Sequence, residues 1–143
     1  MQKTICTAVG AVGGAVSALL GGWSAGLATL LIFMGVDFLS GLIVAGVFHQ
    51  SKKSQTGALE SRAGFKGLCR KGMTLLIVLV AHRLDLALGV GYARDAVIVG
   101  FMANELISIV ENAGLMGLPL PAAVTGAVEI LTRQAEKEAQ HNE

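Results

Sequence analysis

The sequence predicts an all-α integral membrane protein with three to four membrane-crossing helices. Two observations indicate this fold class. No charged residue occurs between Thr4 and Val36, a run longer than the roughly 20 apolar residues that one bilayer crossing needs. In addition, 53% of the 143 residues are hydrophobic, only 15% are charged, and 19 are glycine. Soluble domains carry about 25% charged residues, and glycine is frequent in membrane helices, so the composition favours lipid as the surrounding solvent.

The uncharged run divides into two predicted spans, at about 5–20 and 24–48. The sequence Gly21-Gly22-Trp23-Ser24 separates them and is typical of a turn at the membrane surface. The start of the chain, Lys3 followed by an apolar run, resembles a signal peptide. Because a second apolar segment follows at once, we interpret the first one as a retained anchor.

Two further apolar segments are predicted to span, at about 73–88 and 93–110. They are short for a crossing, as is the segment at 5–20, so each must borrow flanking residues or thin the bilayer. Both carry polar residues at depth, and either could lie partly in the membrane interface. The expected number of crossings is therefore three to four.

A polar loop is predicted at 49–71, where Glu60 is the only acidic residue. Its six basic side chains are Lys52, Lys53, Arg62, Lys66, Arg70 and Lys71. Cytoplasmic loops of membrane proteins carry an excess of Lys and Arg, so we expect this loop in the cytoplasm, touching anionic headgroups. With four crossings, both chain termini are cytoplasmic as well, and the turns at 21–24 and 89–94 are external. One failed crossing would place the C-terminus outside.

The sequence Gly117-Leu-Pro119-Leu-Pro121 is predicted to end the membrane domain, which we place at 1–121. The remainder, 122–143, is predicted to form an amphipathic helix to about residue 139 and a charged cytoplasmic tail. Val124, Val128 and Leu131 recur there at helical spacing, with charges at other positions.

Small residues form one face of the first segment and suggest close helix packing. Such residues let helix backbones approach each other in lipid, where no hydrophobic force drives association. The packing candidates are Thr7, Gly10, Gly14, Ser17 and Gly21, together with Gly41 on the second segment. Two interpretations stay open: packing on the second segment of the same chain, and contact between copies in a homo-oligomer.

Polar residues inside the apolar segments are the candidate functional residues, since a charge in the bilayer centre costs about 2.5–3.5 kcal/mol on insertion scales. The candidates for a polar or pore-lining face are Asp37, Ser40, Arg83, Asp85, Asn104, Glu105 and Ser108. Asp37 and Ser40 share a face with Gly41 and Ala45, and a second stripe is expected to join Phe101, Asn104, Ser108 and Glu111. Three roles stay open: ion pairs of Arg83 with Glu105 or Asp37 that hold a bundle, the lining of a water-filled path, and a proton relay.

No arrangement typical of catalysis is present in the sequence. It lacks a nucleophile-and-base pattern, a phosphate-binding glycine loop after a strand, and metal-ligand spacing around Cys6 or Cys69. We therefore expect no enzyme activity, no cofactor, no metal and no disulfide. Nucleic acid is not an expected partner, since the net charge is only +1 and the basic residues fit a topology signal.

Several motifs together resemble the toxin-secretion and phage-lysis holin family. Met34-Gly-Val-Asp37-Phe-Leu-Ser40-Gly41 is similar to its M-x-x-D-Y-x-T-G element, with Phe38 and Ser40 as conservative departures. The family's remaining elements, S-x-x-G-x-x-G-L-x-R-K, A-x-x-L-D, N-E-x-x-S-I-x-E-N and G-x-P-x-P, resemble residues 61–71, 81–85, 104–112 and 117–121 in the same order. The resemblance covers about residues 34–131.

The resemblance implies a phage-encoded or phage-derived protein of the bacterial inner membrane. Such a protein oligomerises and forms a lesion through which an endolysin or a toxin passes, and the family supplies no catalytic residues. The expected partners are the bilayer, further copies of the chain and the coupled endolysin or toxin, and an antiholin stays open as a regulator. Two other functions stay open: a small ion or proton channel or transporter subunit, and an antiholin-like regulatory membrane protein.

Overall fold

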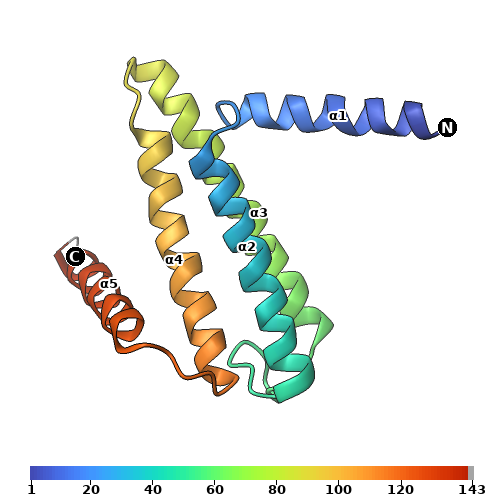
Figure 1. Ribbon diagram of the computed structural model, residues 1–143. Coiled ribbons are helices and arrows are strands. Elements are labelled where there is room, and N and C mark those ends of the chain that lie inside the picture. The colour runs from blue at the N-terminus through green and yellow to red at the C-terminus, as the bar shows by residue number, and fades with distance from the viewer. Residues whose placement is uncertain (142–143) are drawn as a thin grey trace.

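The computed structural model describes residues 1–141, and all of the regular secondary structure in that range is helical (Figure 1). The all-α prediction is therefore confirmed. The elements are α1 (Gln2–Leu19), α2 (Ala25–Ile43), the π-helical turn η1 (Val44–Phe48), α3 (Ser61–Leu88), α4 (Ala93–Leu115) and α5 (Ala122–His141). Helices occur close to the segments expected at 5–20, 24–48 and 93–110.

Helices α2, α3 and α4 form a bundle, in which α4 packs against both of the others. Helices α2 and α4 run in the same direction and α3 runs antiparallel to them (Figure 1). The hydrophobic core lies in the half of the bundle near the α1–α2 turn, and its buried residues are Leu20, Leu27, Leu30, Met34, Val78 and Ile98. The three of them on α2, Leu27, Leu30 and Met34, lie three and four positions apart, which is the spacing of one helix face.

Local signals in the sequence explain where the helices begin and end. Ser24 caps α2, because its hydroxyl accepts a hydrogen bond from the backbone N–H of Leu27 at 3.1 Å. Gly21 and Gly22 precede it with φ of 90° and 89°, a backbone conformation that favours glycine. Gly89, at φ 67°, ends α3 in the left-handed conformation common at helix C-termini.

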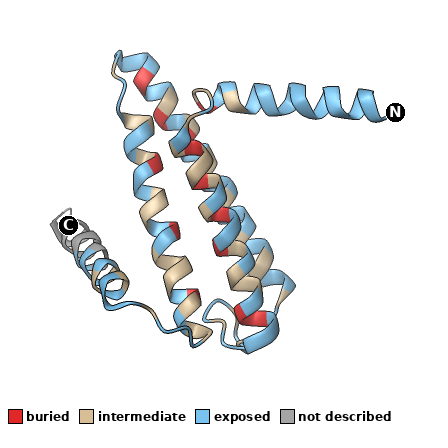
Figure 2. Ribbon diagram, in the orientation of Figure 1, coloured by how far each residue is buried: buried red, intermediate tan, exposed pale blue. Residues whose placement is uncertain are grey.

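The bundle buries polar residues beside its apolar core, while much of its outer surface is exposed (Figure 2). Asp37, Thr74, Asp85, Glu105 and Asn112 are all buried. The outward faces instead carry large apolar side chains, including Ile32, Leu39, Leu76, Val80 and Val99, each more than half exposed. A protein in water prefers the reverse arrangement, so the outer faces of the bundle suit a hydrocarbon environment.

Two helices are long and apolar enough to cross a membrane: α2 with its extension η1 (Ala25–Phe48), and α4 (Ala93–Leu115). Their apolar outer surfaces suit a membrane environment. Helices α1 and α3 do not meet the same criterion in the part of the chain that the structure describes. The number of crossings beyond these two belongs to the proposal below.

The prediction of a polar loop at 49–71 was wrong at its C-terminal half. Helix α3 begins at Ser61, so the loop between α2 and α3 comprises only residues 49–60. Lys and Arg are good helix formers. Arg62, Lys66 and Arg70 therefore extend the helix as exposed side chains and do not interrupt it.

Helix α1 projects away from the bundle (Figure 1). Its residues are exposed apart from Ser17, which is half-buried. A Cβ atom added at Gly10 or Gly14 would meet no atom within 4 Å. Gly10 and Gly14 therefore do not pack on α2 in this structure, whereas Gly21, at the end of the same face, lies against His82 and Arg94. Contact between copies stays a prediction.

Helix α5 follows the Gly117–Pro121 segment and contacts α4. Val124 and Val128 are half-buried while Glu129 is exposed, in keeping with the expected amphipathic character. The side chains of Leu131 and of residues 134–141, together with the whole of residues 142–143, lie outside the described part of the structure.

Candidate functional site

Three charged side chains from three helices meet inside the bundle and form what we call the ionic cluster: Asp37 of α2, Lys71 of α3 and Glu105 of α4. The ammonium of Lys71 donates hydrogen bonds to Oδ2 of Asp37 at 2.8 Å and to Oε2 of Glu105 at 2.6 Å. The side chains of Asp37, Lys71 and Glu105 are only 7%, 14% and 8% exposed. One cation therefore neutralises part of two buried carboxylates and joins three helices.

Polar side chains of α4 complete the surroundings of Asp37. The hydroxyl of Ser108 donates to its Oδ1 at 2.5 Å, and the Asn112 amide donates to the same oxygen at 3.2 Å. Asn112 also donates to the hydroxyl of Ser40 at 2.9 Å. Both Asp37 oxygens are thereby hydrogen-bonded. Such satisfaction is what a buried carboxylate needs, because an unpaired one loses several kcal/mol of solvation.

The sequence periodicity explains why these α4 residues meet the ionic cluster. Glu105, Ser108 and Asn112 follow one another at spacings of three and four, so they occupy one face of α4. The predicted stripe of Asn104, Ser108 and Glu111 lies about one position away from this buried face, because Asn104 and Glu111 are exposed and line the groove beside it. Ser108 alone belongs to both stripes.

Arg83 forms neither of the ion pairs that the sequence left open, with Glu105 or with Asp37. Arg83 is exposed, and Lys71 pairs with Asp37 and Glu105 instead. The inward face of α3 is formed by Lys71, Thr74, Val78, Ala81 and Asp85, which recur at spacings of three and four. Arg83 lies two positions from Ala81 and Asp85 and therefore faces away from the bundle. Lys71, which the sequence assigned to the headgroup-binding loop, is thus the central cation of the ionic cluster.

A second polar site lies at the opposite end of the bundle, around Asp85. Its two carboxylate oxygens accept hydrogen bonds from the backbone N–H groups of Ala93 and Arg94, each at 2.9 Å. Because these groups belong to the first turn of α4, the carboxylate satisfies donors that the helix leaves unpaired and favours the positive end of its dipole. Asp85 is therefore a helix cap that fixes the α3–α4 turn.

Arg94 joins this second site to the α1–α2 turn. Its guanidinium donates to the backbone carbonyl of Leu20 at 2.5 Å and to that of Gly22 at 2.6 Å. Arg94 was not among the predicted functional residues. In the sequence, Arg94 is only a basic residue at the start of an apolar segment. Its partners are backbone carbonyl groups, and no pattern of residue types predicts such contacts.

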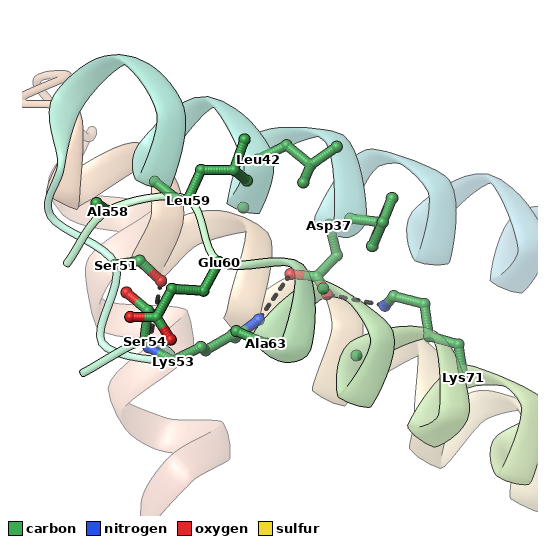
Figure 3. Close-up of a pocket in the computed structure, with 15 residues that line it drawn as sticks. Asp37, Leu42, Ser51, Lys53, Ser54, Ala58, Leu59, Glu60, Ala63 and Lys71 are labelled. Carbon is green, nitrogen blue, oxygen red and sulfur yellow. Dashed lines mark hydrogen bonds and ion pairs between the residues drawn. The ribbon is translucent and has the colours of Figure 1, made fainter. Parts of the chain in front are cut away.

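Two hollows adjoin the ionic cluster. A cavity of about 60 Å³ lies under the 49–60 loop and is lined by Asp37, Lys53, Ser54 and Lys71 among others (Figure 3). Lys53 places its ammonium 3.9 Å from Oδ1 of Asp37, and the buried hydroxyl of Ser54 has no hydrogen-bond partner within residues 1–141. The cavity exceeds the roughly 10–15 Å³ that one water molecule needs, so water can reach the edge of the ionic cluster.

The second hollow is a groove of about 610 Å³ between α3, α4 and the 49–60 loop, which we call the basic groove. Its ionisable lining residues are Lys52, Lys53, Lys66, Arg70, Lys71, Asp37, Glu105 and Glu111. They carry five positive and three negative formal charges, a net of +2. The groove therefore connects the ionic cluster to a positively charged end of the bundle.

No group of His, Cys, Asp and Glu suited to hold a metal ion occurs in the described part of the chain. Cys6 and Cys69 are both free and exposed. The buried charged residues can form ion pairs between three helices, and these pairs must break when the helices separate. A helical membrane protein with an ionic cluster between its helices is the class that this fold and site define.

Comparison with known proteins specifies the class further. Residues 14–133 match the profile of the bacteriophage holin family, and the chain belongs to that family. This is a family of membrane lysis proteins and not a class of enzymes, which agrees with the sequence-based expectation. No solved structure matches the chain.

Three relatives illustrate how far the similarity extends. An uncharacterised protein of Halalkalibacterium halodurans is 37% identical over 143 aligned residues, which cover 96% of this chain and all of the relative. An uncharacterised protein of Listeria monocytogenes is 38% identical over 79% of this chain and 76% of its own length. A probable holin of Bacillus phage phi105 is 27% identical over 80% of this chain and 79% of its own length.

Proposed function

We propose that this chain is a holin that oligomerises in the bacterial cytoplasmic membrane and forms a lesion through which an endolysin or toxin leaves the cytoplasm. The observation that carries the proposal is the ionic cluster of Asp37, Lys71 and Glu105, buried between apolar helices in a member of the holin family. Ionisable side chains at membrane depth are costly and mark functional positions by default.

The ionic cluster supplies a physical basis for delayed assembly. In an isolated subunit, Lys71 shelters both carboxylates from lipid, so the subunit can accumulate without exposing charge. Separation of the three helices breaks these pairs and exposes charged groups that only water or other polar surfaces can satisfy. Oligomers that present the polar faces to a hydrated lumen are then favoured over separated helices in lipid.

We further propose that α2, α3 and α4 each cross the membrane, with the 49–60 loop and the C-terminus in the cytoplasm. The exposed basic residues of the loop and of the first turns of α3, such as Lys52 and Lys66, support this orientation through the positive-inside rule. A cytoplasmic N-terminus requires α1 to be a fourth crossing. In the structure α1 projects to the side of the bundle, so a crossing requires it to turn at Gly21 and Gly22.

The two native cysteines test this topology. Both are exposed on the protein, Cys6 on α1 and Cys69 in the basic end of α3. A membrane-impermeant maleimide added to intact cells is expected to label neither residue if α1 crosses and the basic end is inside. Labelling of Cys6 alone would place α1 on the external surface and reduce the topology to three crossings. Labelling of Cys69 would overturn the proposed orientation.

Induced expression with and without a cytoplasmic endolysin tests the function. The proposal predicts abrupt, endolysin-dependent loss of turbidity after a delay, accompanied by loss of membrane potential. Loss of potential without release of the enzyme would instead favour a small ion or proton channel. No effect from a membrane-inserted chain would favour an antiholin-like regulator.

A variant connects lysis to the ionic cluster. Asp37→Asn keeps the shape of the side chain but removes the charge that pairs with Lys71. It is expected to change the time of lysis, because one fewer charge must be exposed on helix separation. Asp95→Asn is the matched control, since Asp95 lies on α4 with a side chain 69% exposed. Equal lysis times for both variants and the unmodified chain would count against a role of the ionic cluster.

A further inference from the structure

The basic groove contains cations that the chain itself leaves unpaired. Lys71 is occupied by Asp37 and Glu105, and Lys53 lies near Asp37. Lys52, Lys66 and Arg70 form no ion pair with any side chain that the structure describes, although all three line the groove. A concave surface with a net charge of +2 and unpaired cations at its rim is suited to an anion.

The position of the groove indicates where that anion comes from. Lys66 and Arg70 are one helical turn apart on α3, and exposed apolar side chains lie beside them on the same helix: Phe65 is 68% exposed and Leu68 is 51% exposed. Cations alternating with exposed aromatic and aliphatic side chains are typical of the boundary between headgroups and acyl chains. A free anion in the cytoplasm would need the cations but not the apolar neighbours.

Polar groups in the groove can add hydrogen bonds to the charge attraction. Asn104 of α4 is exposed and lines the groove opposite the α3 cations, so its amide is available to a phosphate oxygen. The carboxylate of Glu111 also lines the groove and opposes an anion. The unpaired cations outnumber it, and the other two carboxylates are already hydrogen-bonded to Lys71.

We propose that the basic groove binds the phosphate headgroup of an anionic phospholipid, with Lys66 and Arg70 as its principal ligands. Basic pockets between membrane helices on the cytoplasmic side bind such headgroups through charge and hydrogen bonds. The site rests on the cytoplasmic orientation proposed above. A headgroup bound there lies against Lys71 and Lys53, so lipid composition acts on the surroundings of the ionic cluster.

Native mass spectrometry of the full chain in a zwitterionic detergent, titrated with phosphatidylglycerol, measures this binding. The double variant Lys66→Gln/Arg70→Gln is expected to weaken binding at least tenfold, given about 1 kcal/mol for each basic residue near an anionic surface. Lys3→Gln/Arg62→Gln is the matched control, because it removes the same charge outside the groove. It is expected to change binding less than about twofold. The charge-preserving variant Lys66→Arg/Arg70→Lys should bind as the unmodified chain does.

Each alternative has its own result. Equal weakening by the two double variants would show general charge attraction, and it would overturn a defined site. Binding of inorganic phosphate as tightly as phosphatidylglycerol would identify a site for a free anion and overturn the lipid assignment. Equal binding of phosphatidylcholine would overturn the assignment to an anionic lipid, because phosphatidylcholine carries no net charge. Circular dichroism must show the same helix content for all variants. This measurement of lipid binding does not depend on lysis. The lipid site can therefore be disproved while the holin function stands, and the holin function can be disproved while the lipid site stands.

Discussion

Lys71 and Glu105 lie on different helices, yet the ammonium nitrogen of one is 2.6 Å from a carboxylate oxygen of the other. The same ammonium is 2.8 Å from Asp37, so a single side chain of α3 is bonded to both of its neighbours in the bundle. Because all three side chains are sheltered from the surroundings, any separation of the helices must break these contacts.

Replacement of Lys71 by glutamine is expected to destabilise the bundle strongly. It leaves Glu105 without a cation and Asp37 with only the more exposed Lys53, 3.9 Å away, and breaking a buried pair by removing one partner costs about 3–5 kcal/mol. Thermal unfolding in detergent micelles, followed by circular dichroism, measures the loss. Lys71→Arg keeps the positive charge and should lose less stability. Arg62→Gln removes an exposed cation from the same helix and should change stability by less than about 0.5 kcal/mol. Similar unfolding temperatures for Lys71→Gln and Arg62→Gln would contradict a structural role of the ionic cluster.

Replacement of Asp85 by alanine is expected to loosen the start of α4. The backbone N–H groups of Ala93 and Arg94 lose their acceptor, and the loss of a helix cap costs about 1–2 kcal/mol. Hydrogen exchange at these two amides should quicken, while exchange in the middle of α4 stays slow. Asp95→Ala provides the comparison, because that carboxylate is exposed and accepts no backbone hydrogen bond among residues 1–141. Unchanged exchange in Asp85→Ala would show that the cap contributes little.

Gly21 and Gly22 should respond differently to alanine, although their φ angles are nearly equal. A Cβ atom at Gly21 would lie 2.7 Å from Nδ1 of His82 and 2.8 Å from Nε of Arg94, whereas one at Gly22 meets nothing within 4 Å. Both variants carry backbone strain of about 1 kcal/mol, and only Gly21→Ala also displaces the Arg94 side chain. Spin labels on the native Cys6 and Cys69, diluted with unlabelled chain, report the position of α1. The distance distribution should change more for Gly21→Ala, and equal distributions would contradict the packing around Arg94.

The small-residue face of α1 should matter between copies of the chain and not within one. Gly14→Leu fills the predicted face, while Gly13→Leu adds the same bulk on a different face of the helix. Neither glycine has a neighbour within 4 Å, so the subunit should unfold at the same temperature in both variants. Cross-linking of the chain in membranes should fall several-fold for Gly14→Leu only. Equal cross-linking in both variants would remove this face from the oligomer contact.

The sequence predicted the helices better than the contacts between them. Uncharged runs and glycine turns identify helix positions because each depends on neighbouring residues. The partners of Asp37 depend instead on which faces of α3 and α4 turn inward, and one residue of error changes the answer. Glu105 was predicted and does point inward, but Asn104 was chosen beside it and the inward-pointing Asn112 was missed. Arg83 was chosen as the cation in place of Lys71. Lys71 was misassigned because a cluster of basic residues conceals the one whose register faces the core.

The exposure of α1 has a consequence for how such a protein can vary. A segment that contributes almost nothing to the fold of its own subunit can accept substitutions without unfolding it. Substitutions in the bundle, by contrast, disturb buried charges that tolerate little change. If α1 governs contact between copies, the moment of lysis can be reset by mutations in one arm while the rest of the molecule is preserved. Timing and folding would then be inherited as nearly separate traits of one short chain.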